Sequence, residues 1–223
     1  MSGWLALLGG GEFSFGETEE ADRAWLEKAP PGRVGFVPAA SGSHDYGRHF
    51  ASYLESRFGR EVELVPIYRP RDARRGRNTE RIAACAAVYL GGGVADHLVE
   101  TLAESPALAA LRAKVESDGV VAAIGAAAQA CGEIFRGLTG GGVVRGLALA
   151  PAVAIEPNFD PAHDRRLRSL LARAPQVGRG IGIPAGAALL LGPGGSFEAV
   201  GDVFALAAAE ADLVPLVGES EPA

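Results

Sequence analysis

Short apolar runs recur along the chain, and the segments between them place apolar residues at helical spacing. The runs predict strands, and the intervening segments predict helices. The predicted strands cover residues 4–8, 33–38, 61–67, 87–90, 120–124, 147–150, 180–183, 187–191 and 198–200. The predicted helices cover residues 19–28, 47–58, 79–84, 95–117, 128–136 and 162–174. Strands and helices therefore alternate through most of the chain.

This alternation is typical of a parallel sheet with helices on both faces. We therefore predict an α/β protein with three layers, α/β/α, in a flavodoxin-like arrangement with a mostly parallel sheet. The sequence contains no internal repeat, no low-complexity linker and no shift in composition that would mark a domain boundary. We expect a single domain over residues 1–217, followed by a disordered tail over residues 218–223.

Four of the predicted strands end in glycine or another small residue just before the next helix. The segments are "LLGGGEF", "VPAASGS", "YLGGGVAD" and "AIGAAAQ". The carboxyl ends of parallel strands lie at one edge of the sheet, and ligands of open α/β sheets bind beyond that edge. We therefore expect the four loops to converge on one crevice that carries the function.

The net charge of the chain is −6, from 27 acidic and 21 basic residues. Nucleic acids and anionic membranes both favour a basic surface, so this charge argues against either partner. A local exception is "RPRDARRGR", residues 69–77, which holds five arginines. We predict a solvated loop for this segment, because it lies between a predicted strand and a predicted helix. Phosphate binding is the alternative.

The chain has two cysteines, Cys85 and Cys131, in apolar surroundings. Two buried thiols are expected in a reduced cytosolic protein, and they do not suggest a disulfide framework. The first residues predict a strand rather than a secretory signal. No apolar run approaches the roughly twenty residues that span a bilayer. We therefore expect a cytoplasmic protein.

Six segments carry a resemblance to a known family. They are "LLGGGEF", "GFVPAASG", "YLGGGVADHLVETL", "GVVAAIGAAAQACGE", "IEPNFD" and "GIGIPAGAALLL". In order and spacing they resemble the serine peptidases of the dipeptidase E and cyanophycinase family. That family is built on the class I glutamine amidotransferase-like fold, so the resemblance implies this fold over most of the chain.

The resemblance implies a serine peptidase site in which three residues are replaced. Members of the family carry a nucleophile elbow, Gly-x-Ser-Ala-Gly-Ala, a histidine before a phenylalanine, and an acidic residue after the "GIGI" strand. Carried over to this sequence, the serine position falls on Ala127, the histidine position on Asn158 and the acidic position at or next to Ala185. An alanine methyl group cannot attack a carbonyl, and asparagine does not titrate near neutral pH.

These replacements predict a catalytically inactive homologue of the family's hydrolases. Three losses together leave no route for the proton that a serine must give up. The alternative is an active serine peptidase-like hydrolase that uses displaced residues. His163, five residues after Asn158, is a candidate base for that alternative, although it would still need a nucleophile.

The crevice is expected to keep a binding function. The backbone amides of Gly92, Gly93 and Ala128 could form an anion-binding nest, since such a nest depends on main-chain geometry. Gln129 stands where the family has glycine and is expected at the same crevice. We expect a small anionic or peptide-like ligand, or a protein partner. The alternative is that the glycines merely allow tight turns between strands and helices.

The remaining polar residues indicate neither a second active site nor a metal site. In "SGSHDYG", Ser43 and Asp45 are predicted to cap or turn the chain, and His44 is the best candidate for a polar contact with a ligand. We predict buried packing for Cys131 and a capping role for Glu12. The four histidines and two cysteines lack metal-ligand spacing, so we expect neither a metal nor a cofactor. The family resemblance favours a homodimer.

Overall fold

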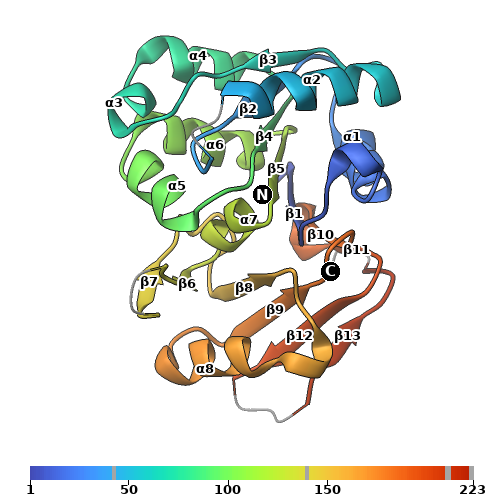
Figure 1. Ribbon diagram of the computed structural model, residues 1–223, viewed down its shortest axis with the longest axis vertical. Helices are drawn as coiled ribbons and strands as arrows, with labels where there is room; N and C mark the ends of the chain where they lie inside the picture. The colour runs from blue at the N-terminus through green and yellow to red at the C-terminus, as the bar shows by residue number, and fades with distance from the viewer. Residues whose placement is uncertain (42–43, 139–140, 209–211, 221–223) are drawn as a thin grey trace.

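The chain forms two β-sheets with helices around them (Figure 1). The computed structural model describes residues 1–41, 44–138, 141–208 and 212–220. Within these residues the first sheet has eight strands, in the order β14 (Glu219–Ser220), β11 (Phe197–Val200), β10 (Ala188–Leu191), β1 (Trp4–Leu8), β5 (Val120–Ile124), β4 (Ala87–Leu90), β2 (Val34–Val37) and β3 (Val62–Leu64). The second has six, in the order β13 (Val214–Leu216), β12 (Val203–Ala207), β9 (Arg179–Ile183), β8 (Val153–Pro157), β6 (Ile134–Arg136) and β7 (Val143–Arg145). β14 lies in the segment predicted as a tail, and residues 221–223 lie outside the described residues.

Five neighbouring strands of the first sheet, β1, β5, β4, β2 and β3, run parallel. Parallel neighbours need crossover connections, which are usually helical. The helices of the described residues are η1 (Phe13–Phe15), α1 (Glu19–Lys28), α2 (His44–Phe58), α3 (Pro70–Ala73), α4 (Gly76–Ala84), α5 (Ala95–Leu102), α6 (Pro106–Glu116), α7 (Ala126–Cys131), η2 (Pro161–His163), α8 (Arg165–Arg173) and η3 (Pro193–Gly195). None of them is long and apolar enough to cross a membrane. The predicted α/β class is confirmed.

Both faces of four of these parallel strands, β1, β5, β4 and β2, are buried, whereas the edge strand β3 is partly exposed. Leu5 and Leu7 of β1 belong to a cluster that includes Leu98 of α5. Ala6 and Leu8 of the same strand belong to a second cluster, which contains the aromatic residues of α1 and α2. Successive side chains of a strand point to opposite faces, so a strand covered on both sides is apolar throughout. This explains why these strands appear in the sequence as continuous apolar runs.

The second sheet packs against the first sheet's helices on one face and against α8 on the other. Ile155 of β8 lies in the cluster that contains Leu5 of β1. Ala154, the preceding residue, lies in a separate cluster with Leu167 of α8. Successive side chains of β8 thus point to opposite faces. The face with Ile155 shares a hydrophobic core with the first sheet, and the face with Ala154 packs against α8.

The predicted helix over residues 95–117 is two helices, with a break before Pro106. Glu104 has a φ of 52°, which is incompatible with a continuous right-handed helix. The Ser105 hydroxyl then accepts a hydrogen bond from the Leu108 amide at 3.1 Å and caps the second helix. Proline suits the first position of that helix, because its missing N–H would have no partner there.

Two predictions near the second sheet are wrong. The segment 147–150 is irregular rather than a strand, because Ala148 has a φ of 48°, outside the β region. The predicted helix 128–136 ends at Cys131, and the chain then becomes extended and enters β6. The sequence pattern therefore misses β6. It also predicts a strand over residues 147–150, just before β8, and none over β8 itself.

The arginine-rich segment 69–77, predicted as a solvated loop, forms α3 and the beginning of α4. Asp72 is buried, and its carboxylate accepts hydrogen bonds from the backbone amides of Tyr68 at 3.3 Å and Arg69 at 3.2 Å. These bonds satisfy amide groups at the start of the helical turn. A buried carboxylate therefore orders a segment whose composition predicts a loop.

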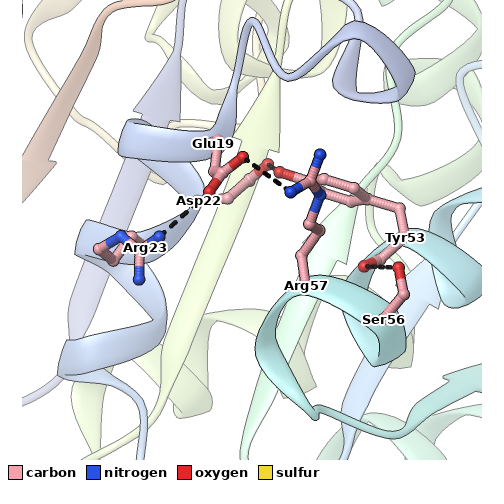
Figure 2. A network of polar contacts seen from close by, with 6 residues as sticks. All are labelled: Glu19, Asp22, Arg23, Tyr53, Ser56 and Arg57. Carbon is pink, nitrogen blue, oxygen red and sulfur yellow. Dashed lines mark hydrogen bonds and ion pairs between the residues drawn. The ribbon is translucent and has the colours of Figure 1, made fainter.

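A second buried carboxylate links α1 to α2. The Asp22 carboxylate accepts hydrogen bonds from the Thr18 hydroxyl at 2.7 Å, the Trp25 indole N–H at 2.8 Å and the Tyr53 hydroxyl at 2.9 Å. Figure 2 shows Tyr53 reaching from α2 towards Asp22 on α1. Burial raises the pKa of Asp22, and the three hydrogen bonds oppose that rise. The three donors therefore stabilise the ionised form of the buried Asp22 carboxyl group.

We expect Tyr53→Phe to lower the free energy of unfolding by about 1–3 kcal/mol, because a buried carboxylate loses a donor while the ring is kept. The control is Ser56→Ala, also on α2, whose exposed hydroxyl donates to the Tyr53 carbonyl at 3.1 Å (Figure 2). We expect the control to change stability by less than about 0.5 kcal/mol. Urea unfolding followed by circular dichroism measures both variants. Equal losses would contradict the role given to Asp22.

Candidate active site

The turn between β5 and α7 has the shape of a nucleophile elbow, and a glycine stands at its apex. Gly125 has φ 56° and ψ −119°, a conformation that strains any other residue. Its N–H donates to the Leu8 carbonyl at 2.9 Å, and its carbonyl accepts from the Gln129 N–H at 3.0 Å. A Cβ added at Gly125 would meet no atom of the described residues within 4 Å, apart from its chain neighbours and its own helix backbone. The apex therefore has room for a side chain, but its backbone favours glycine.

The alanines after the apex lie inside the helix. Ala127, which the resemblance assigns to the serine, is fully buried in the first turn of α7, as is Ala128. Both belong to the main hydrophobic cluster. The apex is Gly125, two residues before Ala127. The structure therefore does not bring the side chain of Ala127 or Ala128 to the crevice.

Three consecutive carbonyls at the end of β1 hold the segments of the site together. The hydrogen bonds run from the Gly125 N–H to the Leu8 carbonyl at 2.9 Å, from the Asn158 N–H to the Gly9 carbonyl at 2.8 Å and from the Gly186 N–H to the Gly10 carbonyl at 3.0 Å. Asn158 directly follows β8, and Gly186 follows Ala185 in the turn between β9 and β10. The positions that the resemblance assigns to the histidine and the acid therefore reach the same edge as the elbow.

Glycines at the end of β1 permit this close approach. A Cβ on Gly9 would lie 2.0 Å from the Pro184 carbonyl oxygen, and a Cβ on Gly10 would lie 2.2 Å from Oδ1 of Asn158. Asn158 is exposed and has a φ of 48°, a region that asparagine enters more readily than most residues. Ala185 is also exposed. The backbone of β1 therefore makes contacts that any larger residue would block.

A pocket of about 240 Å³ lies beside the elbow. Its lining includes Gly93 and Asp96 from the segment after β4, Ala126 and Gln129 from α7, and Arg136 from β6. The structure therefore brings Gly93 and Gln129, two of the predicted ligand-binding residues, to one pocket. It adds two charged residues, which distinguish this pocket from a simple gap beside a tight turn.

The charged residues Asp96 and Arg136 are pocket residues that the sequence analysis does not identify. The Asp96 carboxylate accepts a hydrogen bond from the Leu138 amide at 3.1 Å. Arg136 is exposed, and no ion pair within the described residues involves it. Asp96 could have been found from its place in "YLGGGVAD", whereas Arg136 lay inside a predicted helix and gave no signal.

Other predicted ligand-binding residues lie elsewhere. The Gly92 amide donates to the Tyr46 hydroxyl at 3.4 Å, and Gly92 does not line the pocket. Ala128 is buried within α7. His44 begins α2, but its side chain lies outside the described part of the chain, as does all of Ser43. Of the three residues proposed for the amide nest, Gly93 lines the pocket, and Gly92 and Ala128 do not.

The remaining candidates form no second active site in the part of the chain that the structure describes. Burial raises the pKa of Cys131 to about 12, so its thiol is neutral, and its predicted burial is confirmed. Glu12 caps η1, because its side chain accepts from the Ser14 amide at 3.2 Å, as predicted. His163 Nδ1 lies 2.6 Å from Oδ2 of Asp160, and both side chains are exposed. No three metal-ligating side chains converge among the described residues.

Comparison with known proteins identifies the family. The family described as "Peptidase family S51" matches residues 5–197. The chain belongs to peptidase family S51. The resemblance to the dipeptidase E and cyanophycinase peptidases is confirmed at this level. No curated relative matches the sequence of this S51 member.

Two solved structures are similar to this S51 chain. A peptidase from an acI-B1 Actinobacterium has a TM-score of 0.77 and 21% identity, with 99% of this chain and 97% of the other covered. A putative peptidase E protein from Listeria monocytogenes EGD-e has a TM-score of 0.62 and 16% identity, with 93% of this chain and 99% of the other covered. At these identities the likeness shows the fold, which both proteins share with this chain over nearly their whole length.

In this S51 elbow we expect Gly125→Ala to lower the free energy of unfolding by about 1–3 kcal/mol, because the backbone conformation strains a residue with a Cβ. The control is Gly178→Ala, at an exposed glycine without a positive φ, where no atom of the described part of the chain lies within 4 Å of an added Cβ apart from its chain neighbours. That change should leave stability within about 1 kcal/mol of the wild type. Urea unfolding measures both. A Gly125 variant as stable as the control would argue against the strained apex.

Proposed function

We propose that this member of family S51 does not cleave peptides and has kept its crevice as a binding site. The observation that carries the proposal is Gly125 at the apex of the elbow. In a nucleophile elbow, the attacking side chain stands on the strained residue between strand and helix. Glycine has no side-chain oxygen or sulfur, so no acyl-enzyme can form at that position.

The neighbouring positions support the same proposal. The histidine position falls on Asn158 and the acidic position at or next to Ala185, and both residues lie at the edge that carries the elbow. An amide takes up no proton near neutral pH, and a methyl group cannot orient an imidazole. Taking the apex as Gly125 instead of Ala127 moves the serine position by two residues. The expected loss of catalysis is the same for both positions, because neither glycine nor alanine has a nucleophilic side chain.

The alternative, an active hydrolase with displaced residues, has one observation in its favour. Asp160 lies 2.6 Å from the His163 imidazole, as a carboxylate does when it orients a catalytic base. Within the described residues, however, no hydrogen bond joins His163 to a serine, threonine or cysteine. Cys131 is fully buried and therefore does not meet an incoming substrate. The binding proposal accounts for more of the site.

The pocket beside the elbow supports a small anionic or peptide-like ligand. Arg136 favours a ligand with a carboxylate group, because a guanidinium group can donate two parallel hydrogen bonds to the two carboxylate oxygens. Gln129 adds a side-chain amide that can donate to or accept from a peptide group. A short peptide offers both features, a carboxylate terminus and a peptide group. A protein partner, including a second copy of the chain, stays a prediction from the sequence.

A serine-directed fluorophosphonate, followed by intact-mass spectrometry, tests the loss of catalysis. We expect no adduct on the wild type. Gly125→Ser combined with Asn158→His should gain a slowly formed adduct, because a hydroxyl and a base then stand at the same edge. Ala127→Ser combined with Asn158→His is the matched control and should stay unlabelled, because position 127 is buried in α7. Stoichiometric labelling of the wild type would refute the proposal.

Thermal-shift measurements with dipeptides and dicarboxylates test the binding function. A ligand that binds the folded state raises Tm, and a ligand at about 100 times its Kd stabilises by about 2.7 kcal/mol. We expect Arg136→Ala to abolish the shift. Arg145→Ala removes an exposed arginine of β7 that does not line the pocket, so it should keep the shift. A broad panel without any shift in the wild type would contradict a small-ligand function.

A further inference from the structure

A second pocket, of about 290 Å³, lies between the β6–β7 hairpin and α8. Figure 1 shows α8 at the lower left of the molecule, beside this hairpin. The polar side chains that line it are Arg136 of β6 and Arg165, Arg166, Ser169 and Arg173 of α8. We call it the arginine pocket. Four guanidinium groups from two segments of the chain therefore face one small volume.

The spacing of α8 brings its arginines to the pocket. Arg165, Ser169 and Arg173 are four residues apart, so they lie on one face of the helix. Arg166 stands next to the first of them and lines the same pocket. Leu167 is fully buried in the cluster between α8 and the second sheet. The helix thus directs Leu167 and Leu171 into the core beneath it and three of its four arginines to the pocket.

No carboxylate of the described residues forms a close ion pair with the arginines of the pocket. None of its four arginines takes part in an ion pair there. Arg173 donates to the neutral Gly141 carbonyl at 2.9 Å. Arg168, on the same helix but outside the pocket, is paired with Asp164 at 2.7 Å. Like charges repel unless an anion compensates them, and the chain as a whole is acidic.

One buried carboxyl group acts on this cluster. Glu156 of β8 is 8% exposed, and its Oε2 has no hydrogen-bond partner among the residues that the structure describes. Burial raises the pKa of Glu156, whereas the positive charges of Arg136 and Arg166 lower it. Glu156 does not line the pocket. A single carboxylate cannot neutralise four guanidinium groups, so the arginine pocket stays positive when Glu156 is ionised.

We propose that the arginine pocket binds a small phosphate-bearing anion with two or more negative charges, as in a pyrophosphate group. Guanidinium forks match phosphate oxygens in paired hydrogen bonds, and the Ser169 hydroxyl adds a neutral donor. The described lining includes no aromatic side chain, so the charge is recognised rather than a ring. The proposal does not rest on the loss of catalysis. Its pocket shares Arg136, but no other described lining residue, with the elbow pocket.

Isothermal titration calorimetry with inorganic pyrophosphate on the full chain tests this site. We expect the wild type to bind, with an affinity that falls as salt rises. Arg165→Ala combined with Arg173→Ala should weaken binding by about tenfold or more, because charge-assisted hydrogen bonds are lost. The matched control, Arg145→Ala combined with Arg179→Ala, removes the same charge at exposed positions outside the pocket and should bind like the wild type. Circular dichroism verifies that both variants are folded.

Three results would overturn the proposal. They are failure of pyrophosphate to bind the wild type, equal weakening in the two double variants, and citrate binding as tightly as pyrophosphate, which would indicate a carboxylate site. Arg165 and Arg173 do not line the pocket beside the elbow. A failure here therefore leaves the fluorophosphonate and dicarboxylate results unaffected, and the two proposals can be rejected separately.

Discussion

The candidate site depends on three hydrogen bonds at the end of β1. The carbonyls of Leu8, Gly9 and Gly10 accept from the elbow, from the residue after β8 and from the turn before β10. These segments are far apart in the sequence and come from both sheets. The two glycines make the approach possible, since an added Cβ would lie 2.0 or 2.2 Å from a neighbouring oxygen. The end of β1 thus fixes Gly125 and Asn158 at one edge.

Backbone geometry and chemistry are separable at this edge. Gly125 adopts the dihedral angles of an elbow without the strain that a side chain would add, so the turn can persist when no nucleophile requires it. The arginines of the two pockets lie beyond the elbow, on the second sheet and α8. Arg136 lines both pockets, so one guanidinium group adjoins both of the proposed ligand sites.

The fold class could be predicted from the sequence, because buried parallel strands are short apolar runs. For this reason the strands predicted over residues 87–90 and 120–124 begin and end where β4 and β5 do in the structure. The family could be predicted from six segments whose order and spacing resemble its members. β6 could not be predicted, since it has only three residues and closely follows α7. Its apolar residues continue the helical pattern of α7.

The apex of the elbow could not be predicted from the sequence either. Gly125 matches the leading glycine of the family pattern by residue type, and its dihedral angles alone place it at the apex. The arginine pocket depends on a tertiary contact that no local pattern records.

The central claim is that this edge of the sheet holds no pair of nucleophile and base. The most direct measurement is a crystal structure of the protein that defines the side chains around Gly125 and, separately, the positions of Ser43 and His44. We expect Gly125 at positive φ, and no hydroxyl or thiol within about 3.2 Å of an imidazole nitrogen beside the elbow. A serine, threonine or cysteine hydrogen-bonded to a histidine next to Gly93 or Gly125 would contradict the claim.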